Sequence, residues 1–310
     1  MNLVTFIVVV KNGEGSIVKC LSSLKKQHIE SLEVLIIDGE SDDKTVFLAE
    51  GYLKNNNFNY RILNNPKKTL ASGWNLAIKS SNSKYLIRPD SHSFLSENYI
   101  INGIKRIEKD NLYAAVGGVL ETISNTFVGK IISIVLSNPI GVGPSVFRIG
   151  LKNEIETDTV VYGVYKKELF NSVGLFNEDL KRNQDIEFHK RAKQKGFSMM
   201  TIPTMKAIYY NRPNIKSFSK QAYNNGFWVG KGHGHFRHNI PLFFIITFFT
   251  LIFINLSVFL LFLAVYFSSL LISFIYFSKI YNPLKLLMAL FLTFMLHLNY
   301  GIGTLIGKIR

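Results

Sequence analysis

The sequence has a single cysteine, Cys20, so the chain cannot form an internal disulfide and suits a reducing compartment. It lacks a Gly-x-Gly-x-x-Gly pattern after the first apolar run, and it has no Gly-x-x-x-x-Gly-Lys-Ser/Thr. These absences argue against a dinucleotide-binding oxidoreductase and a P-loop NTPase. No Cys/His spacing typical of structural zinc occurs either.

Charged residues are missing from a long stretch near the C-terminus. The 40 residues from Asn239 to Ser278 include no Asp, Glu, Lys, Arg or His. As a helix they would extend about 60 Å, roughly two crossings of an about 30 Å hydrocarbon core. After a break at Lys279–Lys285, Leu286–Ile306 is a third span or a re-entrant hairpin. We therefore predict a membrane region at 239–306 with two to three helices.

The net charge of +15 would suit a nucleic-acid-binding protein, but its distribution does not. All 21 acidic residues precede Asn239, and the stretch from Met205 to His238 holds six Lys or Arg and no carboxylate. A basic segment directly before an apolar one follows the positive-inside rule and is attracted to anionic headgroups. We expect a juxtamembrane segment at 205–238, no nucleic-acid partner, and an N-terminal domain (1–204) on the cytoplasmic face of the cytoplasmic membrane.

The first ninety residues alternate apolar runs with helical patterns. Leu3–Val10 and Glu33–Asp38 are continuous apolar runs, typical of strands buried on both faces of a parallel sheet. Tyr60–Leu63 and Tyr85–Arg88 are shorter strand candidates, and Thr69–Ser80 has helical spacing. This alternation predicts a doubly wound α/β domain.

The pattern is less regular beyond residue 90. Val116–Val119 contains Gly117 and Gly118 and predicts a sheet element with a close backbone approach. We expect a flexible loop at Asn138–Arg148, a strand at Asp158–Val164 and a loop at Phe170–Asp179.

Polar side chains follow two of the predicted strands. Asp38 ends the second strand, and Asp90 and His92 come directly after the fourth. Ligands of open α/β sheets bind at the carboxyl ends of the strands, where a carboxylate and an imidazole can hold a divalent cation. The alternative is a polar turn that caps the next segment.

Two acidic residues begin a later helical pattern that ends at Gly196. Asp185 and Glu187 lie in its first turn, where the helix dipole favours carboxylates for structural reasons alone. An acid at the mouth of a diphosphate pocket can instead act as a general base.

Taken together and in order, five motifs resemble the family 2 glycosyltransferases with the GT-A fold. The likeness is greatest to the bacterial exopolysaccharide (succinoglycan-type) branch, which tends to carry C-terminal membrane spans, and it extends from about Leu3 to Trp228. The motifs are Lys11-Asn12, Asp38-Gly39-x-Ser41-x-Asp43-x-Thr45, Arg88-x-Asp90-x-His92, Val116-Gly117-Gly118 and Asn183-Gln184-Asp185-x-Glu187.

The resemblance implies a role for each matched acid. Asp38 would contact the nucleotide, Asp90 would bind a divalent metal (Mn²⁺ or Mg²⁺), and Asp185 would be the catalytic base. Two positions depart from the family pattern: His92 replaces the second Asp of Asp-x-Asp, so direct ligation by its imidazole is an open question. Gln184 replaces the Glu that usually precedes the base.

Further donor and acceptor residues are expected around this set. Lys11, Asn12 and Arg88 would lie on the donor side, although Arg88 can instead form a structural pair with an acid. Glu187, Gln221 and Trp228 would lie on the acceptor side. For the last two, the alternative is an amphipathic helix in the membrane interface.

Three histidines, His233, His235 and His238, lie at the end of the basic segment. They suggest either a metal-binding group or a loop at a basic interface. His297 and Asn299, in the last apolar stretch, are expected to face another helix.

The sequence therefore predicts a membrane-anchored, metal-dependent, inverting glycosyltransferase of surface polysaccharide synthesis. One base and one displacement invert the anomeric centre, and no second nucleophile is evident. The donor would be a nucleotide sugar, with UDP as the expected nucleotide, and the acceptor a lipid-linked glycan. The alternatives are a polyprenyl-phosphate sugar synthase and a catalytically silent sugar-nucleotide-binding scaffold.

Overall fold

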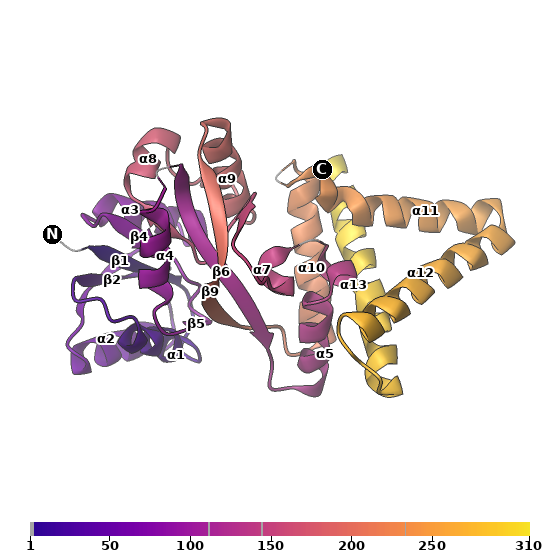
Figure 1. Ribbon diagram of the computed structural model, residues 1–310, viewed down its shortest axis with the longest axis horizontal. Coiled ribbons are helices and arrows are strands. Elements are labelled where there is room, and N and C mark those ends of the chain that lie inside the picture. The colour runs from indigo at the N-terminus through magenta and orange to yellow at the C-terminus, as the bar shows by residue number, and fades with distance from the viewer. Residues whose placement is uncertain (1–2, 111, 144, 233) are drawn as a thin grey trace. The chain divides into compact units, whose positions relative to one another are not determined.

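The computed structural model describes residues 3–110, 112–143, 145–232 and 234–310 (Figure 1). The chain folds into two compact units, each packed mainly within itself. Unit 1 comprises Met1–Glu121 and Gly150–Tyr209, and unit 2 comprises Thr122–Ile149 and Tyr210–Arg310. The expected boundaries at residues 204 and 238 stay predictions, and the segment 122–149 belongs with the C-terminal helices because it packs against them.

A parallel half-sheet opens unit 1, in the order β3-β2-β1-β4. Buried apolar side chains fill its two central strands, which explains their continuous apolar sequences. The strands are β1 (Val4–Val10), β2 (Leu32–Asp38), β3 (Asn59–Asn64) and β4 (Tyr85–Ile87). Val10 pairs with Asp38 and Phe6 with Ile87, so the carboxyl ends of these strands lie along one edge.

Beyond β4 the sheet becomes antiparallel and continues in the order β8-β6-β9-β5, with β7 paired to β9. Because β8 runs opposite to β4, the residues that precede β8 lie at the edge where β4 ends. The strands are β5 (Ser93–Leu95), β6 (Tyr113–Ile123), β7 (Ile155–Thr157), β8 (Val164–Lys166) and β9 (Ser198–Tyr210).

Seven helical segments accompany this sheet. Thr69 caps one of them, α3, by accepting a hydrogen bond from the Ser72 amide. The segments are α1 (Ile17–Ser22), η1 (Ser23–Lys26), α2 (Thr45–Asn55), α3 (Leu70–Ser80), α4 (Tyr99–Ile107), α8 (Glu168–Val173) and α9 (Gln184–Gln194), counted among the described residues.

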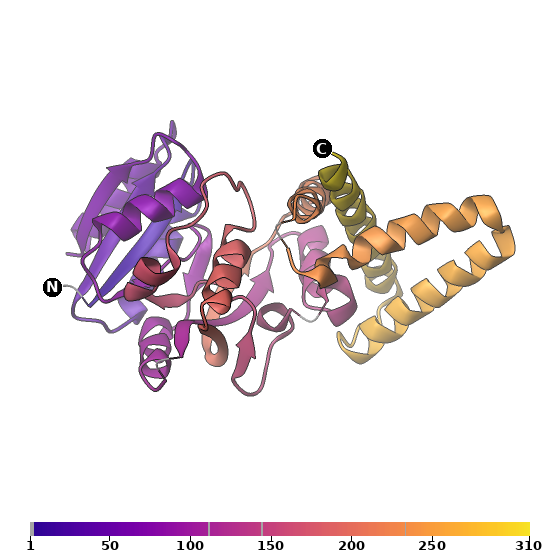
Figure 2. The same cartoon turned by 90° about the horizontal axis from the view of Figure 1, so that it is seen from above.

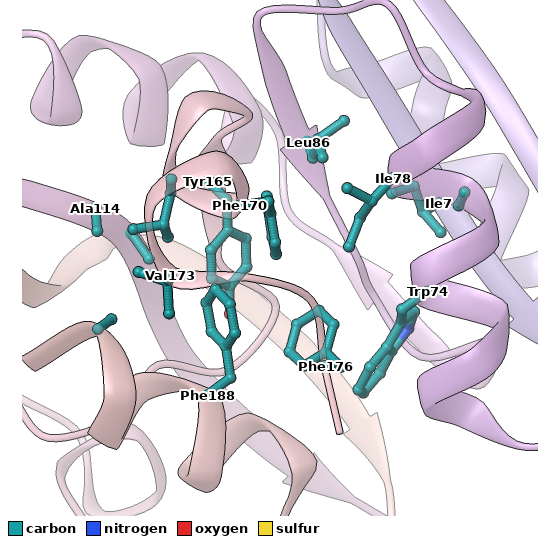
Figure 3. Packing of buried hydrophobic residues seen from close by; sticks show 14 of the residues in the cluster. Ile7, Trp74, Ile78, Leu86, Ala114, Tyr165, Phe170, Val173, Phe176 and Phe188 are labelled. Carbon is teal, nitrogen blue, oxygen red and sulfur yellow. The ribbon is translucent and has the colours of Figure 1, made fainter. Parts of the chain in front are cut away.

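Figure 3 shows an aromatic cluster in the core of unit 1. Phe176 and Phe188 have ring centroids 4.7 Å apart, and Trp74 lies 5.0 Å from Phe176. These contacts join α3 to α9 and to the segment after α8, so the helix that carries Asp185 is fixed to the parallel half-sheet.

Gly117 and Gly118 make the close approach that the sequence predicts. A Cβ at Gly118 would lie 2.0 Å from the Met205 carbonyl oxygen, and a Cβ at Gly117 would lie 2.6 Å from Val160. Only glycine allows β9 and the segment before β8 to approach β6 so closely.

Three local expectations were wrong. Asn138–Arg148 contains the helices α6 (Pro139–Val142) and α7 (Val146–Ile149) rather than a flexible loop, because Asn138 caps α6 through its side chain. The strand expected at Asp158–Val164 starts only at Val164, and α8 occupies the start of the expected loop Phe170–Asp179.

Unit 2 is helical. Three of its helical segments are long and apolar enough to cross a membrane: Phe236–Ile254, Leu256–Tyr276 and Pro283–Ile309, among the residues described. Besides α6 and α7, its helices are α5 (Phe127–Leu136), α10 (Ile215–Gly230), η2 (Phe236–Asn239), α11 (Ile240–Ile254), α12 (Leu256–Tyr276) and α13 (Pro283–Ile309).

Polar side chains connect these apolar helices. His297 of α13 hydrogen-bonds the Tyr266 hydroxyl of α12 (2.9 Å) and the Ile140 carbonyl oxygen of α6 (3.1 Å). The fully buried Asn138 accepts a hydrogen bond from the Ser273 hydroxyl (2.8 Å). His297 thus faces another helix as predicted, and the buried polar groups fix how the apolar helices pack.

Candidate active site

Asp38 lies at the carboxyl end of β2 and organises the loop that follows. Its carboxylate accepts hydrogen bonds from the Ser41 hydroxyl (2.6 Å) and the Ser41 amide (3.1 Å). The Asn12 amide in turn donates to the Ser41 hydroxyl oxygen (2.9 Å). The side chain of Asp38 is half-buried, so it faces solvent at the strand edge.

The loops after β1 and β2 are joined by further hydrogen bonds. The Asn12 side-chain oxygen accepts from the Asp42 amide (3.0 Å), and the Gly13 amide donates to the Thr45 hydroxyl (2.7 Å). Lys11 is exposed at the start of this paired loop. The motif residues of both strands therefore form one structure, which can receive a nucleotide at the strand ends.

Asp90 and His92 come together after β4, as the sequence predicts. Asp90 Oδ2 and His92 Nε2 are 3.9 Å apart, and their side chains are 35% and 39% exposed. The His92 ring packs against Tyr209, with centroids 5.5 Å apart. A carboxylate and an imidazole are thus adjacent and open to solvent.

Two buried residues, Tyr162 and Cys20, contact Asp90. The Tyr162 hydroxyl donates to Asp90 Oδ2 (3.1 Å) from the segment that precedes β8. The buried Cys20 thiol approaches the Asp90 carbonyl oxygen (3.5 Å) from α1. Burial raises the pKa of Cys20 to about 12, and the Asp90 carboxylate adds to that rise. Cys20 therefore stays a neutral packing group.

Arg88 does not sit on the open edge with Asp90. Its side chain is 7% exposed, and its guanidinium lies 4.0 Å from the Trp74 ring centroid and 5.0 Å from that of Phe176. One nitrogen donates to the Tyr165 hydroxyl (3.0 Å), whereas Nε has no partner. The cation is held mainly by aromatic faces and not by an acid, and its donor-side role stays a prediction.

A buried hydrogen-bonded chain extends from Arg88. Because Arg88 donates to Tyr165, the Tyr165 proton can donate to His189 Nε2 (2.9 Å), which leaves Nδ1–H for Thr159 (2.8 Å). Burial raises the pKa of Tyr165; Arg88 opposes this rise, and the Asp185 carboxylate adds to it. The Asp185 carboxylate thus influences the pKa of Tyr165, and Tyr165 is hydrogen-bonded to Arg88, two residues before Asp90.

Asp185 lies in the first turn of α9 and is half-buried. Its Oδ1 accepts a hydrogen bond from the Ile186 amide (2.9 Å). Gln184 is buried and donates to the Leu180 carbonyl oxygen (2.9 Å), so the residue before the expected base serves the local fold. Among the described contacts, none joins Asp185 directly to Asp38 or Asp90, and their convergence stays a prediction.

Glu187 has a structural partner. Arg191 holds its carboxylate with two hydrogen bonds of 2.6 and 2.9 Å and also donates to the carbonyl oxygens of Val173 and Leu175. This pairing fixes α9 to the end of α8. The acceptor-side role of Glu187 stays a prediction.

The other acceptor-side candidates lie in unit 2. Gln221 and Trp228 are half-buried residues of α10, and the Trp228 ring contacts Phe227 edge to face (centroids 5.9 Å). His235 and His238 pack against each other at 5.4 Å, whereas His233 lies outside the described residues.

The donor set after β4 fits a divalent cation shared with a diphosphate. Within the described residues no group of three or more His, Cys, Asp or Glu could hold a metal by itself. Ions such as Mg²⁺ are often held by one or two protein ligands, with substrate phosphates and water completing the shell. The Asp90 carboxylate meets this requirement, and the adjacent His92 imidazole is a second candidate ligand.

Family membership follows from the sequence model of "Glycosyl transferase family 2", which matches residues 5–173, more than half of the chain. The matched range contains β1, β2 and β4 with Asp38, Asp90 and His92. The chain is a family 2 glycosyltransferase.

Curated relatives agree with this assignment. The glycosyltransferase is 30% identical over 277 residues, 86% of each chain, to a Methanococcus voltae protein. That protein is named dolichyl N-acetyl-α-D-glucosaminyl phosphate 3-β-D-2,3-diacetamido-2,3-dideoxy-β-D-glucuronosyltransferase. The present glycosyltransferase is also 25% identical over 218 residues to the uncharacterized glycosyltransferase EpsJ of Bacillus subtilis, covering 68% of this chain and 62% of that one.

Solved structures show the same GT-A fold. A Pyrobaculum calidifontis mannosyltransferase in complex with GDP-Man and Mn²⁺ superposes with a TM-score of 0.54 at 16% identity, covering 71% of this chain and 61% of that one. For residues 1–349 of S. aureus TarS with UDP-GlcNAc the TM-score is 0.51 at 17% identity, covering 71% and 64%. The predicted GT-A domain followed by apolar helices is confirmed.

Sequence reasoning missed the residues behind the site. Tyr162, Tyr165, His189 and Trp74 belong to apolar or irregular segments whose partners are distant in the chain, so no local spacing identifies them. His189 offered the one signal, a histidine on the apolar side of α9.

Proposed function

We propose that the enzyme is a metal-dependent, inverting glycosyltransferase that moves a sugar from a nucleotide donor, a UDP-sugar, to a lipid-linked glycan in surface polysaccharide synthesis. The observation that carries the proposal is the open Asp90–His92 pair at the edge where Asp38 also lies. In this proposal the catalytic domain faces the cytoplasm, because the basic residues precede the apolar helices.

Donor binding rests on the paired loops after β1 and β2. Asp38 and Asn12 hold these loops in one arrangement through Ser41 and would contact the nucleoside. Asp90 and His92 would hold the divalent cation, which, when bound, neutralises charge on the leaving diphosphate.

The base of the reaction would be Asp185. An acceptor hydroxyl is a poor nucleophile at neutral pH, so a carboxylate within hydrogen-bond reach must take its proton during attack. With Asp185 as the base and no covalent nucleophile in the proposed reaction, a single displacement would invert the anomeric centre. Its half-buried position at the start of α9 leaves it accessible to an acceptor.

A lipid-linked acceptor is supported by two observations. The Methanococcus voltae relative is named for a dolichyl-phosphate-linked sugar acceptor and is matched over 86% of its length. Unit 2 has apolar helices that can hold the enzyme at a bilayer. The relative's name favours an acceptor that already carries a sugar over bare polyprenyl phosphate, whereas the apolar helices suit any lipid-linked acceptor.

The proposal is tested by transfer assays with the purified full chain, a panel of nucleotide sugars and two acceptors, polyprenyl phosphate and a lipid-phosphate-linked sugar. We expect transfer to the second acceptor only, with an inverted linkage by NMR. Asp185→Asn should lower kcat by about 10²–10⁴-fold, the usual range for a general base.

Asp110→Asn is the matched control, because Asp110 lies in the turn before β6 and, among the described residues, its side chain accepts one exposed hydrogen bond, from the Leu112 amide. It should transfer like the unsubstituted enzyme. Retention of configuration, transfer to bare polyprenyl phosphate, or full activity of Asp185→Asn would each contradict the proposal. No turnover with any donor would favour a silent scaffold.

A further inference from the structure

We propose that unit 2 is a monotopic anchor for a lipid bilayer. In this arrangement α11 and α12 enter the bilayer from one face and return to it, while α13 lies along that same face beside α10 without crossing. The inference concerns unit 2 alone and does not depend on the proposed reaction. Length and apolar composition would allow all three helices to cross, so their arrangement must decide.

α10 and α13 are paired at backbone contact. Figures 1 and 2 show the two helices side by side. A Cβ at Gly303 would lie 2.1 Å from the Tyr223 carbonyl oxygen, and a Cβ at Gly226 would lie 2.0 Å from that of Tyr300. Each helix carries a Gly-x-x-x-Gly pattern at this contact, the arrangement of closely packed membrane helices. The four glycines are Gly226, Gly230, Gly303 and Gly307.

The pairing fixes which part of α13 lies beside the lysines of α10. The contact positions rise together along both chains, so the helices run parallel. Phe218 and Ala222 of α10 share an apolar cluster with Ala289, Leu292 and Leu296 of α13.

The exposed Lys220 lies between Phe218 and Ala222, and the exposed Lys216 lies one turn earlier. Both are therefore level with the first half and middle of α13. If α13 crossed the bilayer, these ammonium groups would enter its centre, where each costs about 2.5–3.5 kcal/mol on insertion scales. An α13 that lies in the interface leaves them at the headgroups.

The cations at the ends of α13 give the same answer. Lys279 and Lys285 flank its start, and Lys308 and Arg310 lie at its end. A third span would separate these pairs across the membrane, against the positive-inside rule. In the one-faced arrangement all four lie on the side of the basic segment 205–238.

The turn between α11 and α12 has features that suit a position inside the hydrocarbon core. With η2 before it, α11 forms a helical segment of 19 residues, Phe236–Ile254, so the turn at its end rather than its length must decide. Asn255 alone joins the two helices. Its amide donates to the Leu251 carbonyl oxygen (3.1 Å), and its side chain accepts from the Val258 amide (3.1 Å).

Asn255 thus pairs its backbone amide, its carbonyl and its side-chain oxygen within the hairpin, which lowers the cost of placing this turn in hydrocarbon. Its neighbours present apolar surface: Phe253, Ile254 and Leu256 are 86%, 72% and 66% exposed. A tip that emerged on the far side would place these side chains in water.

Contacts at the base hold the hairpin crosswise to α13. The Phe244 and Tyr266 rings lie 4.8 Å apart, and the Tyr266 hydroxyl bonds His297 near the middle of α13. Figure 1 shows α11 leaving α13 at a steep angle. An inserted hairpin therefore leaves α13 in the plane of the membrane.

Single-cysteine labelling of the full chain in sealed vesicles of known orientation tests this topology. The unsubstituted chain is the blank, because its one cysteine is buried. Phe47→Cys reports on the catalytic unit, Tyr281→Cys and Ile309→Cys on the two ends of α13, and Phe253→Cys on the hairpin tip. All four positions are at least 73% exposed.

With a membrane-impermeant maleimide, we expect the cysteines at 47, 281 and 309 to react from one face. The cysteine at 253 should react from neither face until detergent is added. Reaction of the cysteines at 281 and 309 from opposite faces, or none at 309, would overturn the in-plane α13. Reaction at 253 from the face opposite 47 would overturn the re-entrant hairpin.

A second measurement needs no substitution inside the chain. A protease-cleavable tag after Arg310 should be removed from the same face that exposes the catalytic unit. Its protection on that face would contradict the proposal even if a cysteine variant misfolded.

Discussion

At the scale of single residues, Arg88 shows how a motif position can serve the fold. Its guanidinium is enclosed by Trp74, Phe176 and Tyr165, and the Asp90 carboxylate that follows it is open to solvent. The Arg-x-Asp spacing places the cation inside the core and the carboxylate at the edge, since Pro89 and Asp90 leave the strand after Ile87. Arg88 therefore positions the strand end that presents Asp90.

We expect Arg88→Lys to lower the free energy of unfolding by roughly 1–3 kcal/mol, because an ammonium cannot stack on three rings and would be buried. The donor KM should change less than about threefold, since the guanidinium faces the core. Urea unfolding and donor titration measure the two effects. A large rise in KM with unchanged stability would instead make Arg88 a donor ligand.

Arg61→Lys is the matched control for this substitution. Arg61 is 44% exposed and bonds Glu33 at the end of the sheet opposite the site. The Glu33 side chain is only 9% exposed, but a lysine at position 61 keeps the cation beside it and can reach solvent, so we expect a smaller loss of stability than for Arg88→Lys.

The thiol of Cys20 gives a second residue-scale prediction. A thiol of pKa 9.0 is half ionised at pH 9, whereas a pKa of about 12 leaves about one part in a thousand ionised. We expect iodoacetamide at pH 9 to alkylate the folded chain at least about 10²-fold more slowly than the urea-unfolded chain. Equal rates would show that Cys20 is not buried behind Asp90.

The sign of the related stability change follows from the raised pKa. The unfolded thiol loses its proton first, so the Cys20 contribution is complete below pH 9 and falls as the pH rises toward 12.

At the scale of elements, strands and helices of the parallel half-sheet were predictable, because buried strands have continuous apolar sequences. Leu3–Val10, Glu33–Asp38 and Thr69–Ser80 match β1, β2 and α3 within one residue at each end. The strand predicted at Asp158–Val164 was wrong, because most of this segment, including Val160, packs against Gly117 without joining the sheet. Such long-range packing leaves no periodic signal.

The site was predictable only in part for the same reason. Asp38 ends a strand and Asp90 and His92 come after one, so their place at one edge depends on topology alone. Tyr162 and His189 reach the site through tertiary contacts from other segments. Similarly, the glycine pairing of α10 with α13 joins patterns about 75 residues apart.

Gly303→Ala tests that pairing. The new Cβ would lie 2.1 Å from the Tyr223 carbonyl oxygen, so the helices must separate, at about 1–3 kcal/mol. We expect a lower thermal unfolding temperature in detergent. Gly51→Ala in α2 is the control, because nothing lies within 4 Å and alanine favours a helix by about 0.5–1 kcal/mol. Equal unfolding temperatures for both variants would contradict the pairing.

At the scale of the whole molecule, a nucleotide-binding edge and an apolar helical unit are combined in one chain. The two units have different packing rules: unit 1 buries an aromatic core around a sheet, and unit 2 pairs helices through glycines and buried polar groups. The proposed transfer would use both units, because its donor is soluble and its acceptor lies in the membrane.

The central claim is that Asp90 and His92 hold a cation that binds the donor diphosphate. Calorimetric titration of UDP into the full chain, with and without Mn²⁺, tests it most directly. We predict that Mn²⁺ strengthens UDP binding at least about tenfold, that Asp90→Asn abolishes this gain, and that Asp185→Asn keeps it. Equal Mn²⁺ dependence in the unsubstituted chain and in Asp90→Asn would contradict the account.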